Sequence, residues 1–165
     1  LSRGEDALRC FEEALKIEEH RNAWFGKGMA LSSLGRHEEA LKCFDSALKI
    51  YPTDIGAWVG MGTTLSSLGR NAEAIWCFTR ALEINKRQPG AWMGMGVALY
   101  KQGKVEQALE CLDRAIEINP RYAWGWAHKG IALQMQGKRD EASKCFQRAI
   151  EIDPRIADMI RSHFK

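Results

Sequence analysis

A 34-residue repeat runs through most of this chain. One column of tryptophan, two of glycine and two of alanine keep this step. The columns are Trp24, Trp58, Trp92 and Trp126; Gly28, Gly62, Gly96 and Gly130; Gly35, Gly69, Gly103 and Gly137; Ala40, Ala74, Ala108 and Ala142; and Ala47, Ala81, Ala115 and Ala149. A fixed period of about 20–50 residues is typical of stacked supersecondary units, and 34 residues is the length of a helix–turn–helix unit. The sequence therefore predicts an elongated all-α array instead of one closed domain.

Within one unit, the apolar spacing predicts two antiparallel helices. Trp24, Gly28 and Leu31 fall at i, i+4 and i+7, which is one face of a first helix of about 13 residues. Gly35 then supplies a left-handed C-terminal cap. The second helix ends before Pro52, because the residue that precedes a proline resists the helical region. Its expected inner face carries Ala40, Phe44, Ala47 and Leu48.

The glycine column that includes Gly28 indicates a close approach between the two helices. Glycine inside a helix costs about 1 kcal/mol relative to alanine, so a neighbouring group must lie too close for a Cβ atom. We expect the columns of Ala40 and Ala47 to make this approach from the second helix. The bulkier Trp24 and Phe44 should then fill the wider gaps.

Five cysteines follow the repeat but do not predict a site. They are Cys43, Cys77, Cys111 and Cys145, with Cys10 in the same column one residue out of phase. Neighbouring helices pack about 8–10 Å apart, whereas a disulfide needs Cα atoms within ~7 Å and zinc needs sulfurs at ~2.3 Å. We interpret all five as small buried apolar residues. Unpaired thiols favour a reducing, cytoplasmic compartment.

Charge and hydropathy exclude several classes of function. The net charge of +3 is small and evenly spread, without a Lys/Arg run that would follow a phosphate backbone, so we expect no nucleic-acid partner. No apolar stretch approaches the roughly 18 residues of a membrane span, so we expect no membrane partner. The four histidines form no His-x-x-x-His pair, which argues against a metal site.

Three glycine pairs resemble a nucleotide-binding fingerprint. They lie at 26–28, 60–62 and 94–96. That fingerprint requires a preceding strand and a βαβ setting, whereas these glycines recur inside predicted helices. We therefore expect no bound cofactor. No nucleophile–base–orienter set can be identified either, so the sequence does not predict an enzyme.

Residues 23–52 carry the fullest version of the unit. They read Ala-Trp…Gly…Leu…Gly-Arg…Glu-Ala…Phe…Ala-Leu…Pro, and the three following units repeat these columns with few departures. In these columns the chain resembles the tetratricopeptide repeat (TPR) family, over about 155 residues. The resemblance implies a right-handed α-solenoid, a superhelix of stacked antiparallel helix pairs whose first helices line a concave groove. It also implies binding of a protein or peptide, without catalysis.

The repeat sets the expected boundaries of a single array. Residues 1–20 form a partial repeat with the second helix only, and residues 157–165 form a C-terminal capping helix or begin a further repeat. The complete repeats are 21–54, 55–88, 89–122 and 123–156. Because the chain starts where a first helix would end, we interpret the start as a trimmed end of a longer protein; an unrepeated cap is the less favoured alternative.

Departures from the repeat are the best places to look for function, because packing already explains the residues that recur. The columns of the first helix that point away from the second are apolar, and from them we predict a peptide-binding groove. Its residues are Phe25, Met29, Val59, Met93, Val97, Tyr100, Trp124, Ala127, His128 and Ile131. The groove lacks the Lys, Asn and Arg that the resemblance associates with gripping acidic chaperone tails. It also lacks an asparagine ladder, so we expect an apolar segment as its ligand.

Two tryptophans depart from their columns. Trp124 replaces Asn22, Gly56 and Gly90, and with Tyr100 it concentrates hot-spot residue types in the C-terminal half. One interpretation is a helix laid against these residues; the other is that Trp124 and Tyr100 only pack across consecutive first helices. Trp76 stands where the other units have Arg, Lys or Glu. A lone exposed apolar residue needs no function, and a contact with another subunit is the alternative.

The sequence favours an interaction scaffold. Two further functions stay open at this point. The first is a self-associating module that forms homo-oligomers through its N-terminal hairpin and apolar groove. The second is the docking domain of a larger enzyme whose catalytic part lies outside these residues.

Overall fold

The computed structural model describes residues 3–17 and 21–163, and this part of the chain is built from α-helices without any strand. The helices are α1 (Arg3–Ile17), α2 (Arg21–Ser33), α3 (His37–Ile50), α4 (Ile55–Ser67), α5 (Asn71–Ile84), α6 (Pro89–Lys101), α7 (Val105–Ile118), α8 (Ala123–Met135), α9 (Arg139–Ile152) and α10 (Ile156–His163). The prediction of an all-α fold is confirmed.

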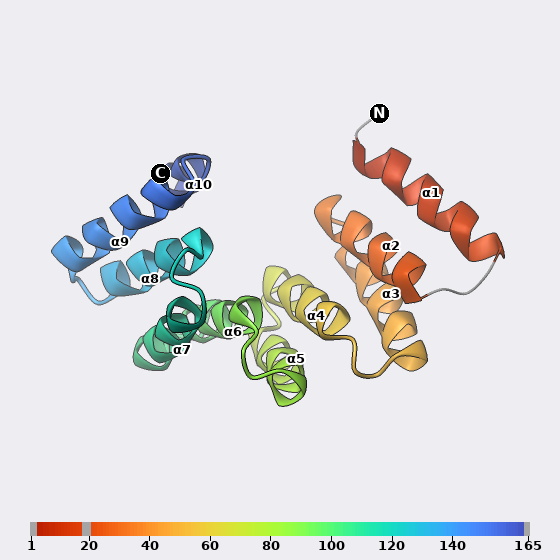
Figure 1. Cartoon of the computed structure of the whole chain (residues 1–165), viewed down its shortest axis with the longest axis horizontal. Helices are drawn as coiled ribbons and strands as arrows, with labels where there is room; N and C mark the ends of the chain where they lie inside the picture. Colours follow the sequence, from red (N-terminus) through yellow and green to blue (C-terminus); the bar gives the residue numbers. More distant parts are fainter. Residues whose placement is uncertain (1–2, 18–20, 164–165) are drawn as a thin grey trace. The chain divides into compact units, whose positions relative to one another are not determined.

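The helices belong to two compact units, residues 1–86 and 87–165. In the N-terminal unit α2 pairs with α3 and α4 with α5, while α1 packs on α2 (Figure 1). The pairs stack through contacts of α4 with both α2 and α3. In the C-terminal unit α6 pairs with α7 and α8 with α9, and α10 packs on α8 and α9. Within each unit the predicted stacking of helix pairs is confirmed.

The turn inside each pair is closed by the predicted glycine. Gly35, Gly69, Gly103 and Gly137 adopt φ values of +76° to +80°, a left-handed conformation that glycine reaches without a steric penalty. At the first of these turns the Arg36 amide donates to the Leu31 carbonyl at 2.9 Å. This bond, from an amide to the carbonyl five residues before it, satisfies a carbonyl that the end of the helix would otherwise leave unpaired.

The close approach is made by a phenylalanine ring at Gly28, Gly62 and Gly130, so our expectation about the alanine columns is wrong there. At Gly96 it is made by Leu112 together with the carbonyl oxygen of Ala108, where the expectation holds. A Cβ added to Gly28 would stand 2.8 Å from Cε1 of Phe44, and a Cβ added to Gly60 would meet the same atom at 2.8 Å. The Phe44 ring therefore fits against two first helices, its own and that of the next repeat. Ala40 and Ala47 are fully buried, but they are not the nearest groups.

The cysteines are free, and four of the five are buried as predicted. They are Cys43, Cys77, Cys111 and Cys145. The expectation is wrong for Cys10, which is exposed. Leu8, on the same helix, is buried at 6% exposure.

Candidate binding surfaces

In the N-terminal unit, the predicted groove residues lie on α2 and α4, and their exposure differs. Phe25 is partly buried, and its Cε2 atom would lie 3.3 Å from a Cβ on Gly56, so the ring packs across to α4. Val59 is also partly buried. Met29 is 48% exposed although its sulfur approaches Gly60. Met29 is thus the most accessible apolar side chain among the predicted residues of this unit.

In the C-terminal unit, three predicted residues form an aromatic cluster, which we define as Tyr100, Trp124 and His128. The Tyr100 hydroxyl and His128 Nδ1 share a hydrogen bond of 3.0 Å between α6 and α8. The Trp124 ring stacks on the imidazole with 6.2 Å between centroids and an interplanar angle of 25°. Tyr100 is 7% exposed, whereas Trp124 is 44% exposed.

The two interpretations of these aromatic residues therefore apply to different members of the cluster. Burial raises the pKa of Tyr100 to about 12, so its hydroxyl keeps its proton over a wider pH range than that of an exposed tyrosine. Tyr100 fastens one first helix to the next. Trp124 lies on the outside of this bond and presents its indole to solvent.

Two more of the predicted groove residues are buried, as Tyr100 is. Ala127 is fully buried in a cluster with Ala149 of α9 and with Ile156 and Ile160 of α10. Ile131 is only 3% exposed. Since α8 lies between α6 on one side and α10 on the other, these positions belong to the packed interior.

Two more predicted positions, Met93 and Val97 on α6, are partly buried. Together with the aromatic cluster they leave a smaller apolar surface than we predicted. Met135, at the end of α8, adds an exposed thioether side chain at 52%. Binding at these residues remains a prediction.

A second surface was missed by the sequence-based predictions. A cleft of about 610 Å³ opens between α3 and α5 above α4, which we call the outer cleft. Its lining residues are Glu38, Leu41, Lys42, Asp45, Met61, Leu65, Arg70, Glu73, Trp76 and Cys77. Trp76 is 57% exposed and meets Trp58 edge to face, with ring centroids 5.2 Å apart at 80°. Trp76 is therefore one wall of a concave site and not an isolated apolar residue on the surface.

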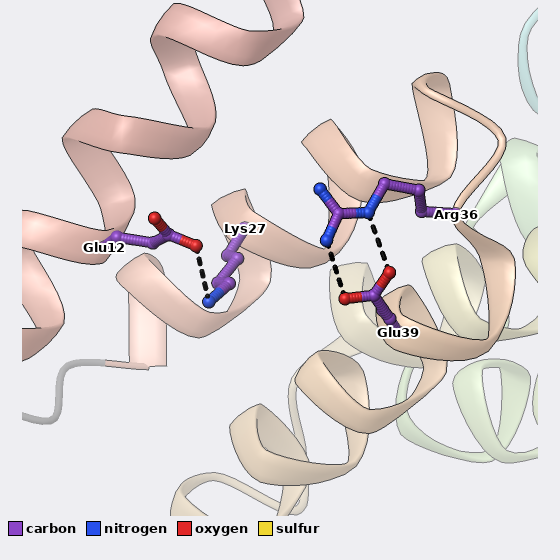
Figure 2. A network of polar contacts seen from close by, with 4 residues as sticks. All are labelled: Glu12, Lys27, Arg36 and Glu39. Atoms are coloured by element: carbon purple, nitrogen blue, oxygen red, sulfur yellow. Dashed lines mark hydrogen bonds and ion pairs between the residues drawn. The ribbon is translucent and has the colours of Figure 1, made fainter.

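The rim of the outer cleft carries a fixed ion pair. Arg70 donates through Nε and Nη2 to the two carboxylate oxygens of Glu73 at 2.7 and 2.6 Å, and it also reaches Glu38 at 3.6 Å. The hydrogen bond from Arg70 lowers the pKa of Glu73. Figure 2 shows the same bidentate arrangement one repeat earlier, between Arg36 and Glu39. Such exposed pairs add little stability, but they hold the guanidinium in place.

Residues 3–17 and 21–163 contain no group of three or more His, Cys, Asp or Glu side chains placed to hold a metal ion. Over the same residues, no helix has both the length and the apolar character needed to cross a membrane.

Comparison with family models identifies the repeat. A model of the tetratricopeptide repeat matches residues 22–54, 89–122 and 123–156, and a model described as TPR repeat matches residues 62–103. The chain belongs to the tetratricopeptide repeat family. Among curated proteins, none matches it significantly.

Solved TPR structures resemble most of the chain at low sequence identity. TTC0263, a thermophilic TPR protein of Thermus thermophilus, is 27% identical with a TM-score of 0.78, over 82% of this chain and 75% of that one. MamA of Desulfovibrio magneticus RS-1 is 22% identical with a TM-score of 0.74, over 92% and 86%. YrrB, described as a TPR protein with an unusual peptide-binding site, is 25% identical with a TM-score of 0.68, over 97% and 82%.

Proposed function

We propose that this protein is an interaction scaffold whose C-terminal unit binds an apolar peptide or protein segment at the aromatic cluster. TPR proteins generally mediate protein–protein interactions, and the structure of YrrB is described as having a peptide-binding site. The observation that carries the proposal is the exposed Trp124 indole, stacked on an imidazole that Tyr100 holds in place. The buried free thiols support a reducing, cytoplasmic setting for this function.

Trp124 has the properties of a binding anchor. Tryptophan is enriched among the residues that dominate binding energy. Its stacking on His128 at 6.2 Å restricts the indole before a ligand arrives, so less conformational entropy is lost on binding. Met93 and Val97 offer apolar contacts on the neighbouring first helix. A segment with spaced apolar side chains, such as an amphipathic helix, fits this chemistry.

The test is affinity capture with three baits: the wild-type protein, Trp124→Ala and Trp76→Ala. The control removes a tryptophan of comparable exposure in the other unit, 57% against 44%. We expect a set of proteins that the wild type and Trp76→Ala capture and that Trp124→Ala loses. A thermal melt should show that Trp124→Ala costs about 1 kcal/mol or less, because the indole is largely at the surface.

Two outcomes would contradict the proposal. One is an unchanged set of captured proteins together with a clear loss of stability in Trp124→Ala, which would reduce Trp124 to a packing role. The other is a dimer in light scattering that dissociates on dilution and is absent in Trp124→Ala. In that case a second copy of the chain, and not a different partner, would occupy the surface.

A further inference from the structure

A lysine on the first helix of a repeat pairs with a carboxylate on the second helix of the repeat before it. In the N-terminal unit Lys27 Nζ lies 3.1 Å from an oxygen of Glu12, as Figure 2 shows. In the C-terminal unit Lys129 Nζ lies 2.5 Å from an oxygen of Asp113. Both lysines are about three-quarters buried, at 23% and 25% side-chain exposure. The pair thus bridges neighbouring repeats at each of these two interfaces.

At the outer cleft this pair is incomplete. The column that holds Lys27 and Lys129 has Met61 on α4, while the carboxylate column still has Asp45 on α3. Both residues line the cleft. Asp45 pairs instead with Lys49 of its own helix at 2.7 Å, where the side chains are 52% and 74% exposed. Such an exposed i,i+4 pair is worth only about 0.5 kcal/mol, so Asp45 can accept a better-placed cation.

The aromatic side chains of the cleft also differ from those of the C-terminal unit by the absence of a lysine contact. In the C-terminal unit the ammonium of Lys129 lies 5.8 Å from the ring centre of Trp126, a cation–π contact. The equivalent tryptophan at the cleft is Trp58, and its ring meets Trp76. Trp76 occupies a column that holds lysine at 42 and at 144. Two indoles and a thioether thus replace the cation that the other interface supplies.

The causes of the raised thiol pKa values in the cysteine column show the same difference in charge. Burial, with a smaller contribution from nearby Glu73, raises the pKa of Cys77 to about 12. Burial also raises the pKa of Cys43 and of Cys145, but there Lys27 and Lys129 act in the opposite direction. Among the described residues no cation opposes the effect at Cys77, where the lysine is missing.

The charges of the lining also leave room for a cation. They comprise three carboxylates and two cations: Glu38, Asp45 and Glu73, with Lys42 and Arg70. Arg70 is already held between Glu38 and Glu73. Lys42 is exposed on the outer surface of α3. Met61 therefore leaves without a cation the position that Lys27 and Lys129 occupy in the other two interfaces.

We propose that the outer cleft docks a partner protein segment that inserts a lysine or arginine next to a bulky apolar side chain. The cation pairs with Asp45, as Lys27 pairs with Glu12 and Lys129 with Asp113. The stem of the basic side chain and the apolar neighbour lie against Trp76 and Met61. A volume of about 610 Å³ lies within the range of about 300–1,000 Å³ of ordinary ligand sites. This surface is separate from the aromatic cluster, so either proposal can fail without the other.

The test is a selection from a displayed library of random twelve-residue peptides on the wild-type protein, after depletion on Met61→Lys. That variant supplies from within the chain the lysine that we expect the ligand to bring, and Lys27 and Lys129 show that the fold accepts it. We expect the enriched peptides to share a lysine or arginine beside an aromatic or aliphatic residue. The best peptide should bind Met61→Lys at least tenfold more weakly in fluorescence polarisation.

Four more variants sharpen the assignment with the same peptide. Asp45→Asn and Trp76→Ala should each weaken binding about tenfold, and Lys49→Ala should leave it unchanged or strengthen it, because Asp45 loses a competitor. Trp124→Ala, in the other unit, should change it less than twofold. Circular dichroism melts of each variant confirm that it is folded.

Several results would overturn the proposal. These are an acidic or wholly apolar consensus, the absence of any enriched peptide, and equal affinity for Met61→Lys. A dimer in light scattering that Trp76→Ala disperses would assign the cleft to a second copy of the chain and would overturn it as well.

Discussion

The interface between α3 and α4 and the one between α7 and α8 are built from the same columns, yet they differ where one has Met61 and the other has Lys129. In the second, Lys129 bridges to Asp113 and covers Trp126. In the first, Met61 leaves the cleft that Trp76 borders. In both, the second helix of one repeat contacts the first helix of the next. The difference teaches that the outer cleft lies where the lysine of the other interface is replaced by Met61 and where Trp76 stands in a column that holds lysine at 42 and 144.

The largest expected effect tests whether the shared packing is equally strong in both units. Phe44 is fully buried and fits against Gly28 and Gly60, so Phe44→Ala should cost about 3–5 kcal/mol. Phe146 packs at Gly130 but is partly exposed, so Phe146→Ala should cost less. Urea denaturation of both variants, with hydrogen exchange to locate the loss, measures the difference. Equal costs would contradict the unequal packing of the two rings.

The alanine columns should respond alike in the two units. Ala74 is 0% and Ala142 is 2% exposed, so replacing either by leucine overpacks its helix pair and should cost about 1–3 kcal/mol. Ala72→Leu, on the exposed face of α5, is the matched control and should be nearly neutral. Thermal melts give the comparison. A variant Ala74→Leu that melts with the wild type would show that this interior has free space.

High pH should weaken the protein through its buried thiols. The pKa of Cys77 is raised from 9.0 to about 12 and that of Cys111 to about 11, in both cases mainly by burial. Above pH 9 the unfolded chain releases a thiol proton that the folded chain keeps, so the free energy of unfolding falls as pH rises. The fall reaches up to about 1.4 kcal/mol per pH unit for each thiol. Below pH 9 both states are protonated and these groups contribute no slope.

Urea denaturation between about pH 7.5 and 10.5 measures this slope. Cys77→Ala should flatten it in the N-terminal unit and Cys111→Ala in the C-terminal unit. If Cys77→Ala keeps the full slope, the thiol is not the group that titrates.

The sequence was sufficient to predict the helices and turns, because each feature recurs in several repeats. Gly35 could be placed at a turn because glycine returns there in every unit, and its φ of +76° confirms the cap. The contacts of the glycine column were harder to predict, since a column shows that something is close but not which group it is. The ring of Phe44, and not the methyl group of Ala40, proved to be the neighbour at Gly28.

The candidate site was predictable only in part, because exposure depends on which helices flank a helix. Trp124 was either a groove residue or a packing residue by its sequence, and it is 44% exposed. Ala127 shares its helix but is buried with residues of α10, and nothing in its own column indicates that neighbour. The outer cleft escaped prediction because it combines residues on different helices: Met61, from a column that holds lysine at 27 and 129 and methionine at 95, and the outlier Trp76. Each of them alone resembles an ordinary surface substitution.

The smallest expected effect is also the most direct test of the difference between the two interfaces, because the key residue can be exchanged in both directions. Met61→Lys should pair with Asp45 and close the cleft, while Lys129→Met should open the seam beside Asp113. Each change should alter stability by about 1 kcal/mol or less, since a pair near the surface contributes little. The exchange should also change the pKa values of two cysteines. The pKa of Cys77 should fall in Met61→Lys, because a cation now faces it, and that of Cys145 should rise in Lys129→Met, because the lysine that lowers it is gone.

Carbon-13 NMR titration of the cysteine Cβ signals measures both shifts without requiring any ligand. Movement in opposite directions would mean that one lysine column decides whether an interface is sealed or open. If neither thiol responds, the ammonium group does not control the charge at these seams, and the assignment of a cation to the outer cleft loses its structural basis.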